Sequence, residues 1–163
     1  MMIESWWLVG AAAVVGGLLA AYWLGRTRPR RRAARRAVEY GRARRDFHHQ
    51  REQLEAKFLD LASNSGKPRG LAWTGCDFDD GVVYARDRRS GELCAFVGVT
   101  ISFAAVEGGG MEEVEAVGNL RAATAVFRLG PTRWSTDGRA IFNLNPVQAV
   151  AHFQDQLVLV GEE

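Results

Sequence analysis

Residues 93–106 read LCAFVGVTISFAAV, and this stretch decides the class of fold. Every second residue from Leu93 to Ala105 is apolar, while Gly98 and Thr100 occupy alternate positions. A period of two residues is typical of a strand rather than a helix. The stretch is longer than an ordinary strand, so we expect it to bend or bulge, and Gly98 is where a glycine allows this.

Turn residues divide the neighbouring sequence into further short strands. They stand at Asp79-Asp80-Gly81, Arg89-Ser90-Gly91, Gly130-Pro131 and Asp137-Gly138. Strand-forming segments are expected at residues 71–76, 82–88, 117–129, 133–136 and 139–144. Every connection is short enough for neighbouring antiparallel strands, so the sequence predicts a curved antiparallel sheet of about five strands.

One helix is predicted before this sheet and one after it. Tyr40, Phe47, Leu54 and Leu61 recur every seven residues, and Phe58 falls on the same helical face. We expect residues 47–62 of this long helix to dock on the sheet.

The second helix is predicted from its first residues. Asn145 is a suitable N-cap, with Pro146 at the first helical position and Gln148 three residues after the cap. The apolar residues Phe153 and Leu157 extend the predicted helix. The order of elements indicates an α+β domain, compatible by analogy with a cystatin-like or nuclear-transport-factor-2-like architecture.

The first 25 residues carry a different signal. Residues 6–24 form an uncharged run of nineteen, which as a helix spans about 28 Å, close to the thickness of a bilayer core. Aromatic residues lie at both ends, Trp6 and Trp7 at one and Tyr22 and Trp23 at the other. The alternative, a cleaved signal peptide, is disfavoured because the only charged side chain before the run is Glu4. We expect an uncleaved single transmembrane helix.

A cluster of arginines follows the apolar run at once. Its members are Arg26, Arg28, Arg30, Arg31, Arg32, Arg35 and Arg36. Arginine resists translocation, so the domain is expected in the cytoplasm, with the N-terminus outside and the chain held in the inner membrane. The same side chains are candidate contacts to lipid headgroups. No aromatic residue interleaves them, as a stacking platform for single strands would require, so nucleic acid is not the expected partner.

Three segments result from these assignments. Residues 1–25 are the expected anchor, residues 26–46 a basic juxtamembrane stalk, and residues 47–163 a cytoplasmic α+β domain. Within the anchor, Ala12 and Gly16, like Ala13 and Gly17, are small residues four apart, a spacing that allows close helix pairing and a homo-oligomer.

The sequence contains few residue patterns that indicate catalysis or metal binding. The carboxylates of Asp77, Asp79 and Asp80 lack the spacing of a calcium loop, and we assign no metal and no cofactor. Cys76 and Cys94 have no base beside them in the sequence, so no catalytic residue is assigned and an enzyme is the less favoured reading.

If the sheet has a concave face, that face is where a ligand would bind. The side chains expected to line it are Trp73, Phe96, Thr100, Arg121, Trp134 and Arg139. Three functions stay open at this point. The first is a membrane-anchored protein-interaction or scaffold module with an unidentified protein partner. The second is a tethered ligand-binding or enzymatic cone. The third is nucleic-acid binding through the arginine-rich stalk.

Overall fold

The computed structural model describes residues 5–65, 71–110 and 120–163, with side chains in the first range described for residues 15–17 and 33–64. The chain divides into two compact units, Met1–Arg45 and Asp46–Glu163. Helix α1 (Ser5–Ser65) begins in the first unit and ends in the second.

The first unit is helical over its described residues. Most side chains of the predicted anchor, residues 6–24, lie outside the described set. Among the residues that are described, no helix is both long and apolar enough to cross a membrane. In the arginine cluster, Arg35 and Arg36 are exposed to solvent, and the other five side chains lie outside the described residues.

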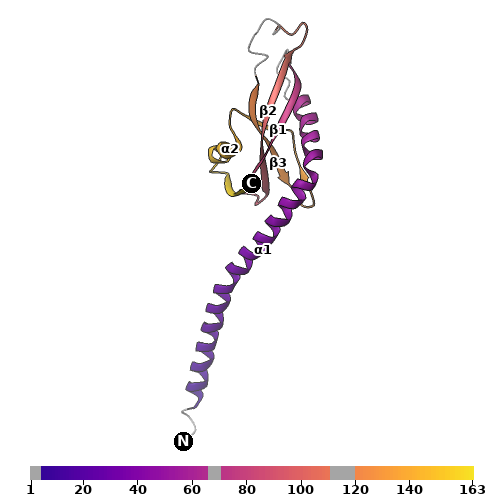
Figure 1. Cartoon of the computed structure of the whole chain (residues 1–163). Helices are drawn as coiled ribbons and strands as arrows, with labels where there is room; N and C mark the ends of the chain where they lie inside the picture. Colours follow the sequence, from indigo (N-terminus) through magenta and orange to yellow (C-terminus); the bar gives the residue numbers. More distant parts are fainter. Residues whose placement is uncertain (1–4, 66–70, 111–119) are drawn as a thin grey trace. The chain divides into compact units, whose positions relative to one another are not determined.

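The second unit contains a six-stranded sheet in which every pairing is antiparallel. Its strands are β1 (Leu71–Asp87), β2 (Leu93–Ala105), β3 (Arg121–Leu129), β4 (Trp134–Ser135), β5 (Ala140–Phe142) and β6 (Leu157–Glu162). The order across the sheet is β4-β3-β2-β1-β6, and β5 also pairs with β3. The predicted class, α+β with a long helix, an antiparallel sheet and a C-terminal helix, is confirmed (Figure 1).

Strand β1 differs from the prediction at Asp79-Asp80-Gly81. These residues do not form a turn, because β1 continues through them as one strand with a shift in register between Phe78 and Val82. Opposite this bulge lies Gly98 of β2, where an added Cβ would overlap the Asp79 side chain. The irregularity expected near Gly98 therefore lies on the neighbouring strand, and Gly98 provides the space for it.

Helix α2 (Pro146–His152) begins where the sequence predicts. The Asn145 side chain accepts a hydrogen bond from the Gln148 backbone N–H at 2.8 Å, and the Gln148 side chain accepts one from the Asn145 N–H at 3.1 Å. The prediction that the helix extends to Leu157 is wrong. The chain turns after His152, and Leu157 begins β6, a sixth strand that the sequence pattern did not lead us to expect.

The two faces of the sheet are covered by different helices. Alternate strand residues such as Tyr84, Ala95 and Phe127, which the registers place side by side, lie on the face against α1, here named the α1 face. Phe47 of α1 packs edge-on against Tyr84, Phe127 and Trp134, with ring centroids 5.0 to 6.0 Å apart. Phe47 and Phe58 are fully buried, so the predicted docking of residues 47–62 is confirmed.

The opposite face, named the α2 face, has a second core. It consists of Val83, Ala85, Cys94, Phe96, Val126, Ala149 and Val150, with Ile141, Leu144 and Leu157 packed around it. Thr124 is fully buried on this face and donates its hydroxyl to the Leu144 carbonyl at 2.7 Å, which satisfies a polar group that burial would otherwise penalise. Figure 1 shows α2 and the docked end of α1 on opposite sides of the strands.

The backbone of the turn between β4 and β5 comes close to α1. Gly138 has φ of +75°, and a Cβ there would lie 2.7 Å from Leu61 Cβ and 2.8 Å from the Ala62 nitrogen. A glycine is required on both grounds, conformation and space. The Thr136 hydroxyl fixes the turn, since it donates to the Val126 carbonyl and accepts from the Gly138 N–H.

Candidate functional site

The structure separates the six side chains predicted to share a ligand site. Phe96 and Arg139 line one pocket on the α2 face. Trp134 is buried on the α1 face, where it packs against Phe47 and Tyr84. Arg121 is exposed at the start of β3, and Thr100 is half-buried on β2. The six residues therefore do not converge on one cavity.

Trp73 lies on β1, beside Phe103 of β2, with ring centroids 5.5 Å apart. Its indole Nε1 is buried and has no hydrogen-bond partner among the described residues. Trp73 is paired with Phe103 at the end of the β1–β2 ladder that is farthest from Arg86 and Leu93. It thus belongs to a different part of the sheet from the pocket that contains Phe96.

The pocket on the α2 face has a volume of about 50 Å³. Its walls are Asp87, Cys94, Phe96, Val126, Arg128, Arg139, Ile141, Phe153, Gln156 and Leu157. The sheet supplies its apolar floor, and the turn that follows α2 supplies Phe153 and Gln156. Two of its lining residues contact each other, since the Arg139 guanidinium carbon lies 5.8 Å from the centre of the Phe153 ring, a cation–π distance.

The carboxylate of Asp87, in the wall of the pocket, stabilises the loop that follows β1. Backbone N–H groups of Ser90 and Arg89 donate to the Asp87 carboxylate at 2.8 Å and, with Arg128 nearby, lower its pKa. Burial raises the pKa of the Cys94 thiol, so the reactive thiolate is disfavoured. A pocket of this volume admits a few water molecules, far less than a typical small-molecule ligand requires.

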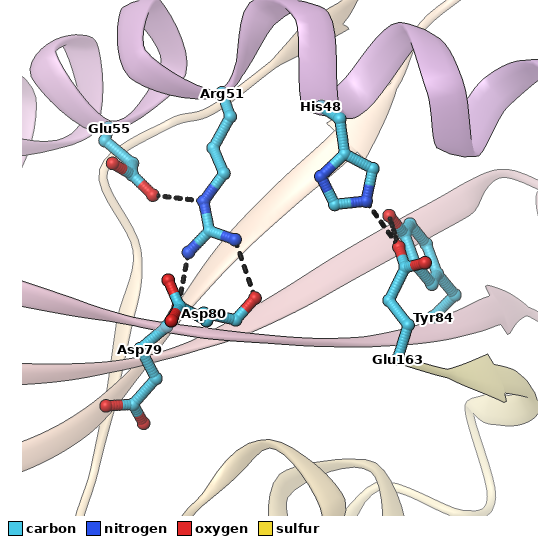
Figure 2. Close-up of polar contacts among 7 residues, drawn as sticks. All are labelled: His48, Arg51, Glu55, Asp79, Asp80, Tyr84 and Glu163. Atoms are coloured by element: carbon cyan, nitrogen blue, oxygen red, sulfur yellow. Dashed lines mark hydrogen bonds and ion pairs between the residues drawn. The ribbon is translucent and has the colours of Figure 1, made fainter.

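A second cluster of polar side chains lies between α1 and the sheet. The Glu163 carboxylate accepts a hydrogen bond from the Tyr84 hydroxyl at 2.9 Å, and the same carboxylate oxygen lies 2.6 Å from His48 Nε2. Figure 2 shows His48 descending from the helix and Tyr84 rising from β1 toward this carboxylate. The Tyr84 ring is fully buried, so the contact gives its hydroxyl a partner.

Arg51 makes the neighbouring contact in this cluster. Its Nε donates to Glu55 at 2.7 Å, and its two Nη atoms donate to the carbonyl oxygens of Asp79 and Asp80 (Figure 2). The guanidinium thus satisfies carbonyls that the bulge removes from the β1–β2 ladder. Figure 2 shows the Asp79 carboxylate pointing away from the helix, toward the face where Gly98 leaves room. The cluster fixes the helix on the sheet.

The pKa of both cysteine thiols is raised, so neither is activated as a thiolate at neutral pH. Burial, with Asp77 and Glu55 nearby, raises the pKa of Cys76 to about 11. Within the described residues, no three histidine, cysteine or carboxylate side chains are grouped so that they could hold a metal ion. The carboxylates of Asp77, Asp79 and Asp80 are exposed on β1 and its bulge.

The feature that sequence reasoning missed is β6, an edge strand with apolar side chains in solvent. Val158, Leu159 and Val160 are 42%, 53% and 37% exposed. Val147 of α2 is 50% exposed. The run Leu157 to Gly161 contains two valines and no charge, a composition that favours a strand and was the available signal.

Comparison of the chain with protein-family models, with curated proteins and with solved structures returned no match in any of the three. The physical features of the two units are thus the basis on which a function is proposed.

Proposed function

We propose that this protein is anchored in the inner membrane by one helix and presents a cytoplasmic domain that binds another protein. The observation that carries the proposal is the uncharged run of residues 6–24, followed directly by seven arginines. Such a run is long enough to span the bilayer core, and the arginines favour retention of the downstream chain on the cytoplasmic side.

The domain supports a binding role more than a catalytic one. Helices cover both faces of its sheet, and the pocket on the α2 face has room for only a few water molecules. An exposed apolar edge strand remains. Surfaces of this kind are typical of protein association.

We further propose that the domain is related in architecture to cystatin-like or nuclear-transport-factor-2-like cones. The support is one long helix packed across an antiparallel sheet whose first three strands are neighbours in chain order. A tethered ligand-binding cone remains the alternative function. It would require the pocket on the α2 face to enlarge well beyond its volume of about 50 Å³.

The anchor is tested by adding one charge at two places. Val15 lies within the apolar run, and Val38 lies beyond the arginines, where it is 73% exposed. Val15→Arg places a charge near the centre of the anchor at a cost of about 3 kcal/mol and should release much of the chain from carbonate-washed membranes. Val38→Arg is the matched control and should leave the chain in the membrane fraction.

Orientation is tested with a reporter enzyme that is active only in the cytoplasm, fused after Glu163. Activity from the wild-type fusion supports the proposal. Either equal release of Val15→Arg and Val38→Arg, or an inactive reporter on a membrane-bound chain, would contradict it. A retardation assay with the full chain and double-stranded DNA, repeated at raised salt, distinguishes nucleic-acid binding by the arginines.

A further inference from the structure

The two edges of the sheet differ in the length of their outermost strands. At one edge, β3 is paired with β4 and β5, which have two and three residues. At the other edge, β6 has six residues and, among the residues that the structure describes, it pairs only with β1. Short edge strands leave little backbone for another chain to pair with, whereas a longer edge strand presents a row of unpaired groups.

The register of β6 shows which backbone groups face away from β1. Glu163 and Val82 exchange two hydrogen bonds, at 2.9 and 3.0 Å, and the Arg88 N–H donates to the Gln156 carbonyl at 2.8 Å. In an antiparallel pair such bonded residues alternate with residues whose N–H and C=O point outward. Leu159 is paired with Ala85 and lies three residues from Gln156 with no register shift between them, so its N–H and C=O face the open edge. The register shifts between Leu159 and Gly161, so the alternation is not counted back from Glu163.

The side chains of β6 leave this edge accessible. From Leu157 to Gly161 there is no charge and no proline, the residues that commonly protect an edge. Val158 and Leu159 are each more than two fifths exposed. An incoming strand would cover them while its backbone pairs with that of Leu159.

The charges around β6 favour one kind of strand over another at the open edge. Glu162 is exposed at the end of the strand, and the exposed Asp79 and Asp80 come just before Val82, the partner of Glu163. A second copy paired antiparallel through β6 would bring its exposed Asp155 toward the exposed Glu162, acid against acid. An antiparallel strand that begins with basic residues meets these carboxylates with opposite charge.

We propose that β6 binds an extended apolar segment of a partner protein, added antiparallel, with lysine or arginine directly before the apolar residues. The proposal rests on the protein-binding function above and names its surface and the chemistry of its partner. Main-chain hydrogen bonds to Leu159 supply affinity, and the acidic end of the edge sets the direction of the incoming strand.

The probe is a fluorescent synthetic peptide with two lysines followed by alternating valine and threonine. Its binding to the full chain in detergent is followed by anisotropy. Two control peptides separate the contribution of charge from that of main-chain hydrogen bonds. One has glutamates in place of the lysines, and the other has alternate backbone nitrogens methylated. Each control should bind at least about tenfold more weakly, the effect expected from losing two hydrogen bonds or reversing the end charge. Equal affinity for the three peptides overturns the proposal.

Two variants of Leu159 locate the site on the chain. Leu159→Pro removes the outward N–H while leaving the bonds of Gln156 and Glu163 to β1 in place, a change that edge strands tolerate. Leu159→Lys adds a charge to the edge, and Val147→Lys adds the same charge to an equally exposed apolar residue of α2. Both Leu159 variants should weaken peptide binding about tenfold, and Val147→Lys less than about twofold. Urea unfolding of each variant verifies that the fold is retained.

The outcomes separate this inference from the proposed function. A partner captured equally by wild type and Leu159→Pro from solubilised membranes leaves the protein-binding function standing and rejects the β6 edge. A concentration-dependent dimer that Leu159→Pro abolishes, without peptide binding, assigns the edge to a second copy and also overturns the proposal. Failure of both peptide binding and membrane association would remove the two proposals together.

Discussion

The α1 face and the α2 face of the sheet are packed with different kinds of side chain. On the α1 face, Phe47 and Phe58 meet Tyr84, Phe127 and Trp134 in edge-on or tilted ring contacts. The α2 face has mostly small aliphatic residues under a helix of seven residues, and it retains a pocket. Burial alone therefore does not measure how much a face contributes to stability. Ring packing and the length of the covering helix also affect how much the free energy of unfolding falls when a buried side chain is removed.

The largest expected difference is between Phe47→Ala and Phe96→Ala. Both side chains are buried, but Phe47 contacts three aromatic rings, while Phe96 borders the existing pocket. We expect the free energy of unfolding to fall by about 5 kcal/mol for Phe47→Ala and about 3 kcal/mol for Phe96→Ala. Urea unfolding measures both, and equal losses would show that the two faces contribute alike.

The next largest effect tests the close approach of the β4–β5 turn to α1. Gly138→Ala introduces a Cβ against Leu61 and Ala62 and imposes a positive φ on alanine, so we expect a loss of about 3 kcal/mol. Gly91→Ala is the matched control, because Gly91 has φ of +77° and nothing within 4 Å of an added Cβ. Its loss should be about 1 kcal/mol, from backbone conformation alone. If the two variants lose the same stability, the approach to α1 is looser than described.

On the α2 face, a smaller effect is expected at the start of the helix. Asn145→Ala removes the side chain that caps the Gln148 N–H and should lower the free energy of unfolding by about 1 kcal/mol. Gln148→Ala removes the reciprocal bond. Because the two bonds belong to one capping box, the double variant should lose less than the two single losses combined. Strict additivity in thermal unfolding would indicate independent contacts.

The smallest effect concerns the two thiols, one on each face. Ionisation of Cys76, with its pKa raised from 9.0 to about 11, is disfavoured in the folded chain. In the unfolded chain the thiol ionises near 9.0, so its contribution to stability is present below that pH and is lost as the pH rises toward 11. Cys76→Ser should flatten this part of the stability profile slightly. Iodoacetamide at neutral pH should label the wild-type thiols only slowly, and rapid labelling of Cys76 would contradict the raised pKa.

How far the sequence predicts this fold depends on whether a signal is local. The alternation of residues 93–105 and the capping box at Asn145 are local, and both elements begin where predicted. The burial of Phe47, Leu54 and Phe58 also follows from their spacing on one helical face.

The errors arise where a distant residue overrides a local signal. Asp79-Asp80-Gly81 has the composition of a turn, yet Arg51 binds its carbonyls and Gly98 leaves space, so β1 continues through it. Phe153 and Leu157 have helical spacing, but Leu157 pairs with Asp87 at the end of β1 and packs on the second core. Neither contact can be inferred from neighbours in the sequence.

The candidate site was less predictable than the fold for the same reason. Phe96 and Trp134 were expected to share one concave site, although the pairing of β2 with β3 and of β3 with β4 determines their faces. Phe96 pairs with Val126 and Trp134 with Leu129, which are three residues apart on β3 and point to opposite faces. The exposed edge of β6 follows from strand order, which composition does not specify.

The unequal edges of the sheet also limit what the protein can assemble into. Polymerisation through sheet edges requires two adhesive borders on each subunit, so that every copy recruits the next. Here the border formed by β4 and β5 is short, and within the described residues β6 is the longer open one. A molecule with a single adhesive border can add one partner strand there but cannot propagate a filament through its sheet edges.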